Sequence, residues 1–221
     1  GREAVMPLRA LGPAALLVLL SACATPPAST PAAPAGAASS GAMTPVTISA
    51  PGPAPAKAGP VPLVNPGFES LVPGRRGDPE GWFTFQHAGD KSYHFVLDTA
   101  QPHGGQRSLR VDNVGPEPYG AVAQSIVAAA YGGKVARFTA WMRTRDVSET
   151  GAVLTLLMLS NGAVVDQNFM ADKPVKGTTG WTRYTITLPV PRGAERVEAG
   201  AMLQGKGSLW LDDATLEFVD P

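Results

Sequence analysis

The sequence contains a single cysteine, Cys23, among its 221 residues. A domain without a cysteine pair has no internal disulfide, so its stability must come from core packing or from a bound ion. The sequence also lacks an excess of either charge, because Lys plus Arg number 18 and Asp plus Glu number 18. Nucleic-acid-binding proteins normally carry a basic excess, so this balance argues against that class.

The N-terminal apolar run is short. It covers Ala10–Leu20 and follows a basic segment at Met6–Arg9, whereas a bilayer-spanning helix needs about 20 apolar residues. Such a run is typical of a signal peptide. It ends in Leu20-Ser21-Ala22-Cys23, which resembles the lipobox of bacterial lipoproteins, whose Cys becomes the diacylated first residue. We therefore predict a signal peptide at 1–22 and lipidation of Cys23, with palmitate among the acyl chains.

The residue after the cysteine indicates a destination. Ala24 stands there instead of Asp, and by resemblance to the lipoproteins of two-membrane bacteria this favours the outer membrane over the inner one. We therefore expect a protein of the cell envelope that is held at a membrane by its lipid anchor. The alternative is an ordinary secretory signal with an incidental cysteine.

Residues 23–62 have almost no charge and almost no large apolar side chain. They consist mainly of Ala, Pro, Gly, Ser and Thr. Such a segment cannot bury enough surface to offset the entropy of the chain. We predict a disordered, Pro/Ala-rich linker that acts as a spacer between the anchor and a folded domain at 63–221.

The folded domain lacks long segments of helical periodicity. It contains short alternating segments separated by Gly, Pro, Asp-Pro and Asn-Gly, which predicts an all-β domain with the architecture of an antiparallel β-sandwich. The Ala121–Ala130 segment has a composition that suits a short helix, but its alternation favours a strand. The predicted strands are Tyr93–Leu97, Ser108–Asp112, Ala121–Val127, Ala136–Arg143, Val153–Leu159, Ala163–Asn168, Thr182–Leu188, Arg196–Leu203 and Ser208–Phe218.

Alternation within these strands assigns side chains to faces of the sheets. Between 138 and 143 the even-numbered residues are apolar, which places Trp141 and Arg143 on the face opposite the core. In the last strand, Leu209 and Leu211 are expected in the core and Trp210 on the other side.

A Trp beside an Arg on the outer face of a sheet suits a saccharide. The aromatic ring stacks on C–H groups, while the guanidinium donates hydrogen bonds to hydroxyls. We predict that the ligand-binding residues are Trp141, Arg143, Gln124, Tyr119 and Trp210. The alternative is that loops cover this face and Trp141 only packs.

Several segments of the domain resemble one family. Asn65-Pro66-Gly67-Phe68-Glu69, Pro79-Glu80-Gly81-Trp82 and the closing 205–213 segment resemble the galactose-binding-like jelly roll of carbohydrate-binding modules. The middle segments 124–126, 141–144 and 173–181 are similar to the jelly-roll domain found ahead of some bacterial secreted or membrane-attached peptidases and regulators. The resemblance covers residues 63–219 and implies a jelly-roll fold with a binding function.

The resemblance also implies a structural calcium ion. In the sugar-binding relatives, an opening Glu and a closing Asp coordinate it, which corresponds here to Glu69 and either Asp212 or Asp213. Oxygen ligands suit this hard cation. Asp213 has the parity of Leu211, so we expect Asp213 to be the ligand. The alternative is that these carboxylates accept hydrogen bonds from loop amides without a metal.

No catalytic signature is present in the sequence. It has no Gly-x-Ser-x-Gly, no His-Glu-x-x-His and no phosphate-binding Gly-rich loop, and its three His residues are loosely spaced. We expect a lipoprotein with a non-catalytic module that binds a glycan or a cell-wall saccharide such as peptidoglycan. The alternative is a structural or interaction lipoprotein that docks an envelope protein. An enzyme comes third, and no nucleic-acid partner is expected.

Overall fold

The computed structural model describes residues 56–74 and 78–221. The predicted signal peptide, Cys23 and the linker as far as residue 55 lie outside these residues. Within the described part of the chain the regular structure consists of β-strands and one 3₁₀ turn, η1 (Ala129–Tyr131). The predicted all-β fold with antiparallel strands is therefore confirmed.

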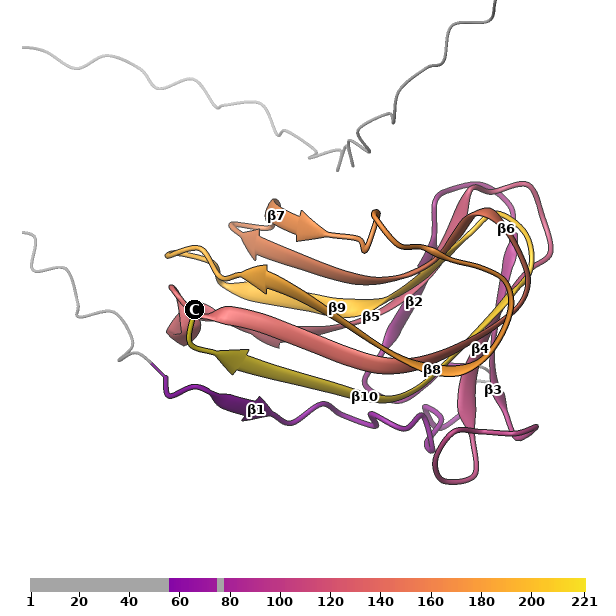
Figure 1. Cartoon of the computed structure of the whole chain (residues 1–221), viewed down its shortest axis with the longest axis horizontal. Helices are drawn as coiled ribbons and strands as arrows, with labels where there is room; N and C mark the ends of the chain where they lie inside the picture. Colours follow the sequence, from indigo (N-terminus) through magenta and orange to yellow (C-terminus); the bar gives the residue numbers. More distant parts are fainter. Residues whose placement is uncertain (1–55, 75–77) are drawn as a thin grey trace, which may run out of the picture. The chain divides into compact units, whose positions relative to one another are not determined.

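The strands form a sandwich of two layers (Figure 1). All of the strand pairings are antiparallel. The strands are β1 (Gly59–Val61), β2 (Phe83–Gln86), β3 (Tyr93–Asp98), β4 (Ser108–Asn113), β5 (Tyr119–Val127), β6 (Val135–Ser160), β7 (Ala163–Asn168), β8 (Val175–Pro189), β9 (Arg196–Gln204) and β10 (Ser208–Val219).

The 26-residue strand β6 belongs to both layers. Its first half pairs with β10 and β8, and its second half pairs with β9 and β7. The first sheet therefore has the order β3-β4-β10-β6-β8, with β1 also on β10, and the second has the order β2-β5-β9-β6-β7. The sequence predicted two separate strands here. Register shifts against β8 between Met142 and Ala152 bend one continuous strand instead.

The core lies between the two sheets, where the alternation placed it. Phe138, Ala140 and Met142 on β6 are fully buried, as are Leu209 and Leu211 on β10. The second sheet supplies the facing residues Leu154, Leu156, Met158, Val197, Ala199, Ala201 and Leu203. Each large apolar side chain removed from water contributes about 1.5–3 kcal/mol. This packing is the main source of stability that the structure shows.

Two strands were missed by the sequence argument. β1 lies within the predicted linker and pairs Gly59–Val61 with the end of β10, so the folded domain begins before Leu63. A Pro in the middle of β1 is tolerated because β1 is an edge strand. β2 was missed because Phe83 and Phe85 point away from the core. The segment at 121–130 is strand as far as Val127, as predicted.

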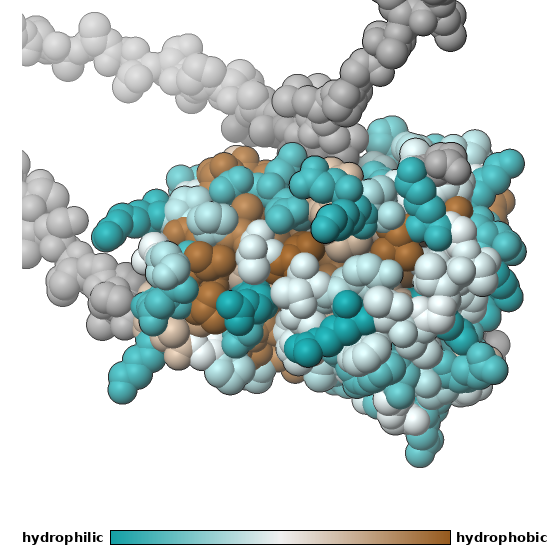
Figure 2. All heavy atoms as spheres, in the orientation of Figure 1, coloured by the Kyte–Doolittle hydropathy of each residue, from teal (hydrophilic) through white to brown (hydrophobic). Residues whose placement is uncertain are grey.

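The outer surface mixes apolar and polar areas. Figure 2 shows apolar residues gathered in a band across the middle of the viewed side, with polar residues above and below it. Val164 and Val165 on β7 are among the apolar side chains that remain about half exposed. No helix in the described ranges is both long enough and apolar enough to cross a bilayer.

The close approach of β5 and β9 makes a testable prediction at Gly200. A Cβ atom there would overlap the carbonyl oxygen of Val122 and lie 2.8 Å from the Cα of Ala123. We expect Gly200→Ala to lower the free energy of unfolding by about 1–3 kcal/mol, because the backbone must shift. Gly180→Ala on β8 is the matched control, since its Cβ would meet nothing within 4 Å. Equal denaturant midpoints for the two variants would contradict the argument.

Candidate functional site

Three of the five predicted ligand residues lie together on the outer face of the first sheet. Trp141 and Arg143 project from β6 and Trp210 projects from the neighbouring β10, directly opposite Arg143. The Arg143 guanidinium carbon lies 4.3 Å from the centroid of the Trp210 ring, which is the geometry of a cation–π contact. The parity argument therefore placed this group correctly.

The loop at 99–107, between β3 and β4, covers much of this group. The His103 ring stacks on Trp141, with centroids 3.8 Å apart and an interplanar angle of 18°. Gln101 accepts hydrogen bonds from Arg143 through its side chain at 2.9 Å. Trp210 is only 4% exposed. The expected open sugar platform is therefore occupied by the protein's own side chains, which is the alternative that the sequence left open.

The sequence argument missed two members of this group. Trp181 on β8 donates from Nε1 to the backbone oxygen of Gln101 at 3.0 Å and lies under Arg143, whose guanidinium is 5.3 Å from its ring centroid. His103 contacts both Trp141 and Trp181. Neither could have been placed from the sequence, because a register shift in the β6–β8 pairing and an irregular loop position them.

Gln124 does not belong to this face. It lies on β5 in the second sheet, is 6% exposed, and points inward as Val122 does. Its Oε1 accepts a hydrogen bond from Val64 N at 2.8 Å and its Nε2 donates to Val64 O at 2.9 Å. Both polar ends of Gln124 thus hold the N-terminal segment against the sheet. This is a structural role and corrects its place in the predicted site.

Tyr119 also lies on β5, but it faces outward and joins an aromatic row. We use this term for Phe83, Phe85, Tyr119 and His87. The row has centroid separations of 5.8 Å for Phe83–Phe85, 6.5 Å for Phe85–Tyr119 and 5.6 Å for His87–Tyr119. Phe83 is 40% exposed and Phe85 is 43% exposed. Beside the row lies an apolar cluster of Ala121, Val153 and Met202.

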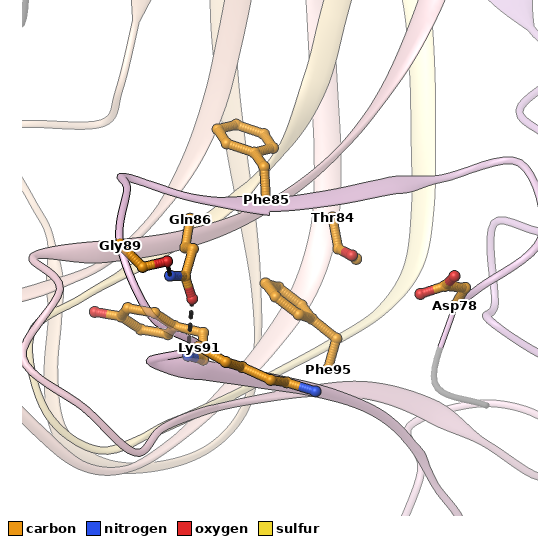
Figure 3. Close-up of a pocket in the computed structure, with 8 residues that line it drawn as sticks. Asp78, Thr84, Phe85, Gln86, Gly89, Lys91 and Phe95 are labelled. Carbon is orange, nitrogen blue, oxygen red and sulfur yellow. Dashed lines mark hydrogen bonds between the residues drawn. The ribbon is translucent and has the colours of Figure 1, made fainter. Parts of the chain in front are cut away.

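The same strand β2 borders a pocket of about 380 Å³ on its inner side (Figure 3). Thr84 points toward this pocket, whereas Phe85 points to the opposite side of the strand. The wall facing β2 comes from Lys91, Tyr93 and Phe95. The pocket and the aromatic row therefore lie on the two sides of one edge strand.

Gln86 fixes the shape of this pocket. Its Oε1 accepts a hydrogen bond from Ser92 N at 2.8 Å, and its Nε2 donates to Ala88 O at 2.6 Å and to Asp90 O at 2.8 Å. One side chain thus ties the β2–β3 loop to β2. The sequence argument missed the pocket because it skipped β2, although the alternation of Phe83, Thr84, Phe85 and Gln86 was a usable signal.

The carboxylates that the resemblance assigned to calcium do converge near the 103–107 loop. Glu69 Oε1 accepts hydrogen bonds from Gln106 N at 2.9 Å and Arg107 N at 3.3 Å. Asp212 Oδ2 accepts from His103 N at 2.9 Å and Gly104 N at 3.1 Å, and its Oδ1 accepts from the next backbone N–H. These carboxylates hold the loop in place.

Asp212, rather than Asp213, is the buried carboxylate. Asp212 is 0% exposed, and burial raises the pKa of its side chain to about 6 despite three backbone hydrogen bonds that lower it. Asp213 has a φ of 45° and pairs through Oδ2 with His103 Nδ1 at 2.6 Å, at the surface. The parity argument failed because a register shift follows Asp212. A bulge puts consecutive residues out of alternation.

This junction does not fit a calcium site well. Calcium takes six to eight oxygen ligands, whereas here backbone N–H groups occupy oxygens of Glu69 and Asp212. The described residues contain no group of three or more His, Cys, Asp or Glu arranged to hold a metal. The arrangement favours the metal-free alternative over the sequence prediction of calcium at Glu69 and Asp213.

Comparison of the sequence with known proteins finds one curated relative. No family model matches the chain. The uncharacterized HTH-type transcriptional regulator YbfP of Bacillus subtilis is 26% identical over 148 residues, which are 64% of this chain and 48% of that protein. The matched region thus spans about half of that relative's length.

Solved structures resemble the sandwich with little sequence identity. A Stig cyclase from Fischerella sp. TAU has a TM-score of 0.54 at 13% identity, covering 74% of this chain and 99% of its own. A xylan-binding domain of Paenibacillus barcinonensis has a TM-score of 0.48 at 13% identity, covering 70% and 92%. At 13% identity, the likeness to the cyclase supports the fold alone, an antiparallel β-sandwich.

Proposed function

We propose that this chain is a lipid-anchored protein of the cell envelope whose sandwich is a non-catalytic glycan-binding module, with its site at strand β2. The observation that carries the proposal is the arrangement on that strand. Exposed aromatic rings lie on one side of it, and a pocket of about 380 Å³ with polar groups lies on the other. The site therefore differs from the Trp141 platform that the sequence predicted.

Phe85 belongs to the aromatic row and also borders the pocket, so this edge strand can offer a saccharide both kinds of contact that it uses. The exposed rings of Phe83 and Phe85 offer surfaces on which the C–H faces of a sugar stack. Thr84 and Lys91 offer a hydroxyl and an ammonium group at the pocket, which suit sugar hydroxyls. Pockets of this volume, with aromatic walls and a few polar groups, are typical of small-ligand sites.

We propose binding rather than catalysis for this site. Glycoside hydrolysis generally needs two carboxyl groups that flank the scissile bond. Among the described residues that line the pocket, Asp78 is the one carboxylate. The geometry at β2 thus favours recognition of a glycan over its cleavage.

A second candidate function, docking of an envelope protein, has a specific observation in its favour. Phe83 and Phe85 are neighbouring exposed rings on the outer face of the second sheet, and Tyr119 beside them packs on the buried apolar cluster. Contiguous exposed apolar surface often marks a protein-binding site. The two functions differ in their ligand, and one set of variants separates them.

The first test of the glycan site is Phe85→Ala in the full chain. We expect binding on a glycan array, or to purified peptidoglycan, to weaken about tenfold, because one stacking surface is lost. Val165→Ala on β7 is the control, since it removes an exposed apolar side chain away from β2. If no saccharide binds the unmodified protein, the glycan function is wrong. Capture of an envelope protein that is lost in Phe85→Ala would then support docking.

The lipid anchor is tested independently of any ligand. Cells that express the full chain should incorporate labelled palmitate into it, and Cys23→Ala should abolish the label, because the thiol is the predicted acylation site. Sorting to the outer membrane is read from the membrane fraction that carries the label. Label retained in the Cys23→Ala protein rules out lipidation at this residue.

The calcium prediction is tested by thermal unfolding of the full chain. Since backbone N–H groups already satisfy oxygens of Glu69 and Asp212, we expect the same melting temperature in calcium and in chelator. An ion that binds only the folded state raises the melting temperature with its concentration. A melting temperature that rises with added calcium, and not with magnesium, would show instead that calcium binds at this junction.

A further inference from the structure

On the outer side of the first sheet, the guanidinium groups of two arginines contact the ring of one buried tryptophan. The guanidinium carbon of Arg143 lies 4.3 Å from the Trp210 ring centroid and that of Arg145 lies 5.3 Å from it. Both arginines project from β6, two residues apart, so they share a face. We call Arg143, Trp210 and Arg145 the Arg–Trp clamp.

The carboxylates near the clamp already have partners. Asp98 Oδ2 accepts hydrogen bonds from Trp210 Nε1 at 2.7 Å and from Arg110 at 3.1 Å. Asp112 Oδ2 accepts from Arg110 Nε at 2.8 Å. Arg110 thus forms ion pairs with Asp98, which accepts from the indole N–H, and with Asp112.

The two arginines of the clamp have only neutral acceptors within the described residues. Arg143 donates to Gln101 Oε1 and Ala100 O, and Arg145 donates to Ser208 Oγ at 3.4 Å. The Nε of Arg143 is shielded from water and has no hydrogen-bond partner. Two guanidinium groups therefore contact one indole ring, and neither forms an ion pair with a carboxylate of the described residues.

This arrangement has an electrostatic cost that an anion would relieve. Burial, together with the positive charge of Arg145, lowers the pKa of Arg143, while Asp98 partly opposes this effect. Like charges repel most strongly where water is partly excluded. Guanidinium groups form planar forks that match carboxylate and phosphate oxygens, and such charge-assisted bonds are among the strongest in proteins.

We infer that the Arg–Trp clamp is a binding site for an oxyanion, a carboxylate or phosphate group carried by a ligand. Arg145 is exposed and provides the accessible fork. Arg143 provides the second positive charge and holds the 99–107 loop beside it. The site lies on the first sheet and does not depend on the glycan site proposed at β2 on the second. An acidic polymer that reached both would combine the two contacts.

The test uses the full chain and matched probes. Trigalacturonate carries carboxylates, its methyl ester is the neutral counterpart, and inorganic phosphate is the second oxyanion. Titration calorimetry measures affinity, and quenching of tryptophan fluorescence reports binding near the Trp residues of the first sheet. We expect trigalacturonate or phosphate to bind and the ester to bind at least about tenfold more weakly, because charged hydrogen bonds are lost. The probe that binds shows whether the site takes a carboxylate or a phosphate group.

The decisive variant is Arg145→Gln, which removes a charge that makes only one long hydrogen bond in the fold. We expect its affinity for the anionic probe to fall about tenfold and the salt dependence of binding to weaken. Arg137→Gln is the control, since Arg137 lies on the same strand and face but pairs with Glu217. Phe85→Ala should leave this binding unchanged, which separates it from the β2 site. Equal affinity for acid and ester, or an equal loss in Arg137→Gln, overturns the assignment.

Discussion

The passage of β6 from one sheet to the other is the constraint on which the rest of the structure depends. One strand of 26 residues pairs with β10 and β8 in its first half and with β9 and β7 in its second. The bend lets Phe138 and Leu154 contribute to one core from opposite layers. It also directs Arg143 to the outer side of the first sheet and Val153 to the outer side of the second, where Val153 is buried under Tyr119, Phe169 and Met170. Both candidate binding surfaces therefore depend on a single backbone bend.

A second constraint joins the ends of the domain to its surface loop. Glu69 near the start and Asp212 near the end both accept backbone hydrogen bonds from the 103–107 loop. Burial of Asp212 costs free energy, as its raised pKa indicates, and the loop amides offset part of that cost. The same loop carries His103 onto Trp141. The contacts that close the sandwich thus also cover the predicted sugar platform.

Alternation in the sequence predicted the core because it needs only regular strands. It placed Phe138, Met142 and Leu209 correctly, and it put Trp141 and Arg143 on one outer face. It failed wherever the backbone leaves regular alternation. Because of the bulge after Asp212, the buried carboxylate is Asp212 and not Asp213. Because of the bend in β6, the sequence argument divided this one strand into two. Gln124 was misplaced because alternation within a strand does not tell which sheet the strand joins.

The burial of Trp210 and the charge of its neighbours are two aspects of one arrangement. An indole that is 4% exposed needs a partner for its N–H, and Asp98 supplies it. Arg110 forms an ion pair with Asp98, and neither Arg143 nor Arg145 donates a hydrogen bond to it among the described residues. A chain with zero formal net charge can therefore carry a local positive site, because its carboxylates are committed elsewhere. A net charge of zero argues against an overall basic protein, but it leaves room for a site made by two guanidinium groups at one ring.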